Sequence, residues 1–210
     1  MPTPCLYDTC ESLTPWSWSS LLTPSIDTSI KKEGTASIKV LKAAYYDGPT
    51  QQFARDFAQC DSYFGIWLRH NLAQANQAWT IRVVKANGAF ADISFAWNAF
   101  VGYVIWSDAV YALGGSAGYS NGYSAPNEWA FYEIYTDAVG NTAFHKNGVF
   151  THTYAGYGIY PTAYLRVHCG VYGVPSQSLW LDYAKWGPGW DYPPVPPSLK
   201  LHPFWKLKPP

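Results

Sequence analysis

The chain has 210 residues, enough for one sizeable domain, and its formal net charge is zero. This neutrality gives no support to binding of nucleic acid or of an anionic membrane surface, and no apolar run approaches the ~20 residues of a membrane span. Aromatic residues make up 18% of the chain and charged residues 13%, so we expect some of the aromatic rings to be exposed as well as buried.

The first residues, M-P-T-P-C-L-Y-D-T-C-E, have neither the basic nor the apolar region of a signal peptide. If the protein works outside a cell, we expect it to leave in an assembled virus particle, or a signal to have been removed already. Cys5, Cys10, Cys60 and Cys169 allow three disulfide pairings. A Cys5–Cys10 loop, a Cys60–Cys169 bridge across a sheet and four reduced thiols all stay open.

Strand signals follow one another along the body of the chain. In chain order they are T-A-S-I-K-V-L-K, Y-F-G-I-W-L-R, W-T-I-R-V-V-K, A-F-A-D-I-S-F-A-W, F-V-G-Y-V-I-W, W-A-F-Y-E-I-Y-T, T-A-F-H-K, V-F-T-H-T-Y, A-Y-L-R-V-H-C-G-V-Y and S-L-W-L-D-Y-A-K-W. Asn87-Gly88 and Asn147-Gly148 predict tight hairpin turns, because these residues accept positive φ angles. The Gly/Ser-rich stretch 113–126 is expected to be a loop, and 71–80 to hold a helical turn or a loop.

Nine or ten strands with regularly spaced turns predict an all-β fold, an antiparallel two-sheet jelly-roll sandwich over residues 1–190. Residues 191–210 are rich in proline, which predicts an extended C-terminal arm. A solvated linker would not need large apolar side chains, so we expect the arm to dock on another subunit. The expected anchors are Leu199, Leu201, Phe204, Trp205 and Leu207.

Three stretches, D-T-C-E-S-L-T-P-W, E-G-T-A-S-I-K-V and L-W-L-D-Y, resemble the concanavalin A-like jelly roll. That group includes laminin-G-like domains and several carbohydrate-binding modules, and the resemblance covers roughly residues 6–187. It implies a structural calcium ion held by Glu11, Asp182 and backbone carbonyls near 32–35, with Glu33 as a further ligand. The alternative is that Asp182 accepts hydrogen bonds from backbone N–H groups or pairs with a cation.

Catalytic patterns are weak in this sequence. The four glutamates are Glu11, Glu33, Glu128 and Glu133, and the last two are five residues apart, which places them on opposite faces of a regular strand. A sandwich glycosidase needs two carboxylates facing one cleft. We therefore assign no catalytic residue and expect a protein that is not an enzyme.

The composition leads to two expectations about function. The first is a structural or adhesive surface protein of an assembly, such as a virion decoration, a capsid or tail-associated protein or an extracellular filament subunit, located on a virion or outside the cell. The alternative is a soluble carbohydrate-binding module or, with less support, a glycoside hydrolase. The candidate sugar-stacking residues are Trp97, Tyr103, Trp106, Tyr119 and Tyr123.

Overall fold

A computed structural model describes residues 6–14, 16–18, 22–42, 51–60, 63–74, 77–85, 88–112, 115–136, 141–154, 162–169 and 177–187. Within these ranges the side chains of residues 6, 51–52, 56–60, 85, 112, 115–116 and 162–169 are not described. All the regular elements in the described ranges are β-strands, which confirms the predicted all-β class. No helix in these ranges is both long enough and apolar enough to cross a bilayer.

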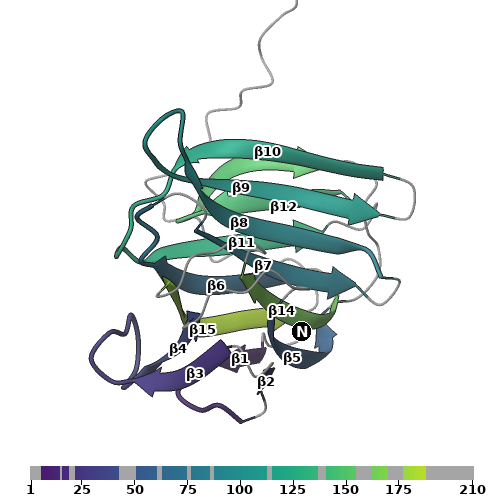
Figure 1. Cartoon of the computed structure of the whole chain (residues 1–210). Coiled ribbons are helices and arrows are strands. Elements are labelled where there is room, and N and C mark those ends of the chain that lie inside the picture. Colours follow the sequence, from purple (N-terminus) through teal and green to yellow (C-terminus); the bar gives the residue numbers. More distant parts are fainter. Residues whose placement is uncertain are drawn as a thin grey trace, which may run out of the picture.

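The strands form two antiparallel sheets that lie face to face (Figure 1). The first sheet has the order β13-β12-β11-β6-β15-β4-β3, and β1 also pairs with β15. Its strands are β1 (Leu6–Asp8), β3 (Leu22–Asp27), β4 (Ser37–Lys42), β6 (Tyr63–His70), β11 (Ala130–Thr136), β12 (Thr142–Lys146), β13 (Val149–Tyr154) and β15 (Gln177–Gly187).

The second sheet has the order β10-β9-β8-β7-β14-β5-β2. Its strands are β2 (Ser17–Trp18), β5 (Gln51–Cys60), β7 (Ala78–Lys85), β8 (Phe90–Asn98), β9 (Tyr103–Ala112), β10 (Gly115–Tyr123) and β14 (Thr162–Cys169). Neighbours such as β14 and β5 are far apart in sequence, as expected for a sandwich whose connections cross between sheets.

Alternate residues of both sheets meet in one apolar core. Trp79, Ile81 and Val83 of β7 point into it, and so do Ile93 and Phe95 of β8. Because side chains alternate along a strand, the residues between them lie on the outer face of the second sheet. One face of each sheet is therefore buried in the core, and the opposite, outer face can contact a ligand.

Of the predicted turns, the second hairpin forms and the Gly/Ser loop does not, whereas Asn87 of the first hairpin lies outside the described residues. Asn147 and Gly148 both have positive φ, 53° and 76°, which confirms the second predicted hairpin turn. Residues 115–123, which were expected to be a loop, instead form β10. The loop prediction was wrong because hydrogen bonding to β9 over eight register pairs outweighs the weak strand preference of glycine and serine.

Candidate functional site

The outer face of the second sheet carries a row of polar residues that crosses four strands. Register pairs link β7 to β8, β8 to β9 and β9 to β10. The residues in this polar row are Thr80, Ser94, Ser107 and Ser120. At a strand spacing of ~4.8 Å, the row is about 14 Å long, so it can contact more than one unit of an extended polymer lying across the strands.

The next row along the strands is charged at its centre. Arg82 of β7 binds Asp92 of β8 through two parallel hydrogen bonds, Nε to Oδ1 and Nη2 to Oδ2, both 2.8 Å long. The guanidinium carbon lies 3.5 Å from the centre of the Phe90 ring. Burial raises the pKa of the Asp92 carboxyl, although its hydrogen bonds to Arg82 act in the opposite direction.

The Arg82 guanidinium is therefore fixed in its plane by a buried carboxylate and an aromatic ring. Asp92 uses one N–H on Nε and one on Nη2, and a guanidinium has five N–H groups. The remaining groups can donate to a planar acceptor such as a carboxylate. Arg82 is partly exposed and can reach a ligand, whereas its partner Asp92 is almost fully buried.

The backbone register brings β14 beside this pair. Arg166 is paired with Arg82 on one side and with Ala54 on the other, and His168 is paired with Thr80. Residues paired across antiparallel strands lie on the same face. The backbone positions of Arg166 and His168 are therefore direct neighbours of Arg82 and Thr80 in the sheet.

The expected sugar-stacking residues do not lie on a common face. Trp106 is 3% exposed and belongs to the core, and Trp97 packs partly against that core, so the alternation that puts Phe95 inside puts Trp97 there as well. Tyr103 and Tyr123 are exposed and meet edge to face, with centroids 5.4 Å apart. Tyr119 is exposed and stacks on His152 instead.

Glu133 lies on the outer face of the first sheet, away from the polar row. The carboxylate is buried and accepts hydrogen bonds from Tyr63 Oη at 3.1 Å and Tyr135 Oη at 2.8 Å. Glu128 precedes β11 and is exposed. The two glutamates therefore do not share a strand, and the expectation that they lie on opposite faces of one strand was wrong because β11 begins at Ala130.

The structure brings Glu11 and Asp182 to the same loop, residues 28–36. Asp182 Oδ2 accepts hydrogen bonds from the backbone N–H groups of Lys32 and Glu33, at 2.6 and 3.0 Å. Glu11 Oε1 accepts from the N–H and hydroxyl of Thr35, at 2.5 and 2.9 Å. These backbone donors are the alternative considered for Asp182 from the sequence.

The fit of this region to calcium can be tested on the remaining oxygens. Asp182 Oδ1 is buried and has no hydrogen-bond partner, which leaves one carboxylate oxygen for a cation. Glu33 Oε1 instead accepts from the indole N–H of Trp67 at 2.9 Å. No three His, Cys, Asp or Glu side chains gather around one point in the described ranges, so backbone oxygens would have to supply most of the ligands.

Several sequence expectations fall outside the described residues. These include the C-terminal arm with its anchors Leu199, Leu201, Phe204, Trp205 and Leu207, and the side chains of Cys5, Cys60 and Cys169. Cys10 is a free, buried thiol, so the alternative of a Cys5–Cys10 bridge is not formed. Burial raises the pKa of the Cys10 thiol to about 12.

Comparison with solved structures places the chain in a known fold. An endo-β-1,4-glucuronan lyase from the fungus Trichoderma reesei has a TM-score of 0.62 at 12% identity, with 88% of this chain and 95% of that chain covered. A Bacteroides ovatus GH16 mixed-linkage glucan protein, solved with its G4G4G3G product, has a TM-score of 0.63 at 8% identity, covering 85% and 98%. A Bacillus licheniformis β-glucanase has a TM-score of 0.58 at 8% identity, covering 89% and 99%.

These likenesses show the fold, and they confirm the resemblance to the concanavalin A-like jelly roll. No family model matches the chain, and no curated protein matches its sequence. The expectation of a non-enzymatic assembly protein is contradicted, because the similar structures are carbohydrate-active enzymes: a lyase and glucanases. They agree better with the alternative that had the least support from the sequence, a glycoside hydrolase of sandwich fold.

Sequence reasoning missed the arginines because it searched for pairs of carboxylates. A usable signal was present: Arg82 and Arg166 each lie inside an apolar alternating strand, with no acidic residue next to them in the sequence. A cation at such a position needs a partner across the sheet or a ligand. Only the pairing of β14 with β7 shows that the two arginines are neighbours.

Proposed function

We propose that the protein is a polysaccharide lyase that cleaves a 4-linked uronic acid polymer on the outer face of the second sheet. The observation that carries the proposal is the fixed and partly exposed Arg82 guanidinium bound to Asp92 on this face. The backbone positions of Arg166 and His168 are paired with Arg82 and Thr80 on the neighbouring strand. The structural likeness to an enzyme described as a glucuronan lyase supports it. Such polymers lie outside cells, so an extracellular setting belongs to the proposal.

The chemistry of β-elimination matches these residue types. A base removes the proton on C5 of the uronate, the electron pair forms a C4=C5 double bond, and the C4–O bond breaks as the leaving oxygen gains a proton. Negative charge builds up on the uronate carboxylate, which arginine stabilises through paired hydrogen bonds. His168 is the candidate base, because a neutral imidazole accepts a proton near neutral pH.

Hydrolysis fits the same face less well. Among the side chains that the structure describes on β7, β8 and β9, Asp92 is the one carboxylate on the outer face, and it is bound to Arg82. Hydrolytic pairs lie about 5 to 9.5 Å apart. Elimination needs no such pair, so it agrees better with the geometry.

The test is incubation with polyglucuronate, followed by ultraviolet absorbance of the new double bond conjugated to the carboxylate. We expect absorbance to rise with the wild type, to be lost in His168→Ala, and to be absent with a neutral β-1,4-glucan. New reducing ends without the double bond would show hydrolysis and overturn the lyase assignment. Binding without any cleavage would instead support a carbohydrate-binding module.

We also propose that calcium binds between the N-terminal segment, the loop 28–36 and β15. The buried and unpartnered Asp182 Oδ1 supports this, with Glu11 as the second carboxylate ligand. When bound, the ion would offset the buried charge of Asp182 and tie three segments together. Its role is structural, because the site lies on the first sheet, away from the polar row.

A further inference from the structure

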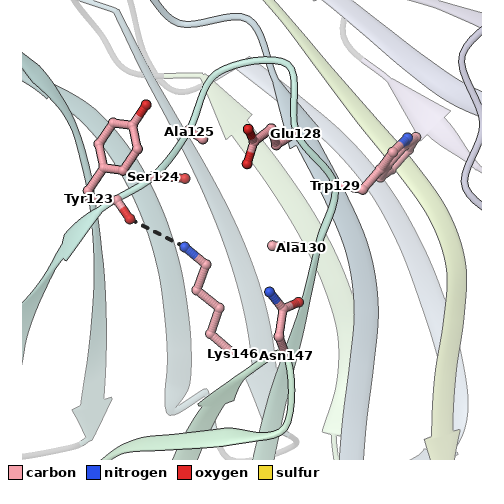
Figure 2. A pocket seen from close by; sticks show the side chains of 8 residues that line it. All are labelled: Tyr123, Ser124, Ala125, Glu128, Trp129, Ala130, Lys146 and Asn147. Atoms are coloured by element: carbon pink, nitrogen blue, oxygen red, sulfur yellow. Dashed lines mark hydrogen bonds between the residues drawn. The ribbon is translucent and has the colours of Figure 1, made fainter.

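A small pocket of about 160 Å³ lies where β10 leads into β11, beside the end of β12 (Figure 2). Its lining residues are Tyr123, Ser124, Ala125, Glu128, Trp129, Ala130, Lys146 and Asn147. The volume lies below the ~300 Å³ at which pockets for drug-sized ligands begin. The pocket can therefore accept part of one small ring rather than a whole oligosaccharide.

The pocket presents a donor and an acceptor of opposite charge. Figure 2 shows the Glu128 carboxylate and the Lys146 ammonium group on opposite sides of it, while the Trp129 ring points away. Lys146 Nζ donates to the Tyr123 carbonyl oxygen at 3.3 Å. Glu128 acts on Lys146 through its charge, yet the two are not within ion-pair distance. A ligand between them can bond to both.

Two lining residues, Ser124 and Asn147, already use a side-chain oxygen in a hydrogen bond. Ser124 Oγ is bonded to His70 Nε2 at 2.9 Å, and Asn147 Oδ1 accepts from the Phe131 N–H at 2.8 Å. A ligand would therefore meet the charged groups of Glu128 and Lys146 rather than a free serine hydroxyl. Hydroxyl groups suit this arrangement, because each can donate to a carboxylate and accept from an ammonium group.

Tyr123 links the pocket to the proposed catalytic face. It lines the pocket and is also paired with Ile105 of β9, a position on the outer face of the second sheet. Its ring is 56% exposed and lies against Tyr103. A polymer lying across β8, β9 and β10 would reach this aromatic pair and then the pocket.

We propose that the pocket is a distal subsite that binds the hydroxyl groups of one sugar residue of the polymer. Glu128 and Lys146 bond to the hydroxyls, and Tyr123 stacks against the ring. This inference rests on the proposed function, since it takes the same substrate. It adds a specificity-determining site that lengthens the stretch of polymer recognised beyond the arginines.

The test compares the binding of glucuronan trimers and octamers by calorimetry, in the wild type and in Glu128→Gln and Tyr123→Ala. Both altered residues are exposed, so the fold should be retained. We expect each change to weaken octamer binding about tenfold and to leave trimer binding unchanged. Glu128→Gln loses a hydrogen bond to a charged group, and Tyr123→Ala loses a stacking contact. Tyr7→Ala, an exposed tyrosine on the other sheet, is the matched control and should change neither.

Equal losses for trimer and octamer would place these residues in the main site and overturn the subsite, as would octamer binding unaffected by either change. Binding that matches the expected pattern, with no elimination product from the wild type, would retain the subsite and overturn the lyase. Elimination with no effect of the variants on octamer binding would do the reverse. The two proposals therefore fail separately.

Discussion

At the scale of single residues, the bidentate contact between Arg82 and Asp92 is the most specific feature of the outer face. A guanidinium matches a carboxylate on two edges, whereas a lysine is a point charge. Asp92 is almost fully buried, so its carboxylate orients Arg82 without being exposed to solvent or to a ligand itself. The pair thus positions one cation where a uronate carboxylate is proposed to bind.

Replacing Arg82 by lysine should lower kcat/KM on polyglucuronate by roughly tenfold or more, because the second hydrogen bond and the fixed plane are both lost. Steady-state kinetics on the purified variant checks this. Arg69→Lys, which changes an arginine on the first sheet, should leave kcat/KM unaltered. Equal kinetics in Arg82→Lys and the wild type would remove Arg82 from the site.

His70 should make the stability of the fold depend on pH. The ring is buried and bonded to Ser124, and burial lowers its pKa from 6.5 to about 4. The unfolded chain therefore binds a proton that the folded chain excludes between these values. The contribution of neutral, buried His70 to the free energy of unfolding should be complete above pH 6.5. It should fall by about 3 kcal/mol as the pH drops to 4.

Denaturant titrations at pH 7 and pH 4 on the wild type and His70→Gln isolate this contribution. The wild type should lose more stability than the variant over this range, because other titrating groups are common to both. If the two proteins lose the same amount, His70 is not the origin of the effect.

At the scale of strands, close packing across β6 and β11 depends on a glycine. A Cβ at Gly65 would lie 2.5 Å from Tyr63 Oη and 2.8 Å from Phe131 Cζ. Tyr63 is buried and bonded to Glu133, so its movement would disturb a buried carboxylate. The small residue at this position lets the aromatic side chains of both strands close over Glu133.

Gly65→Ala should therefore cost about 1–3 kcal/mol of unfolding free energy, as expected for overpacking and for weakening a hydrogen bond to a buried charge. Urea midpoints give the measurement. Tyr63→Phe removes the same hydroxyl without the steric conflict and should cost less. A smaller loss in Gly65→Ala than in Tyr63→Phe would contradict the steric argument.

At the scale of the whole molecule, the proposed calcium ion would tie the N-terminal segment and the loop 28–36 to the last strand. Chelator should lower the melting temperature, and added calcium should restore it, because an ion that binds only the folded state stabilises that state. In Asp182→Asn the response to chelator should disappear. A melting temperature that changes with neither chelator nor calcium would rule out the ion.

The sequence by itself determined the all-β class, the second hairpin turn and most of the strands. Each of these follows from local chemistry: alternation of apolar residues, and tolerance of positive φ at Asn147 and Gly148. It also placed Glu11 and Asp182 near one loop through a family resemblance. It failed for β10, where pairing with β9 outweighs the preferences of glycine and serine.

Only the tertiary structure decided which residues share the candidate site. Arg82 and Arg166 are 84 positions apart, and they become neighbours because β14 pairs with β7 rather than with a strand near it in sequence. Similarly, the sequence predicted that Trp106 stacks on a sugar, whereas the packing of the two sheets buries its ring in the core. The local sequence pattern determines which residues of a strand share a face. Strand order and the packing of the two sheets determine which residues and ligands that face contacts.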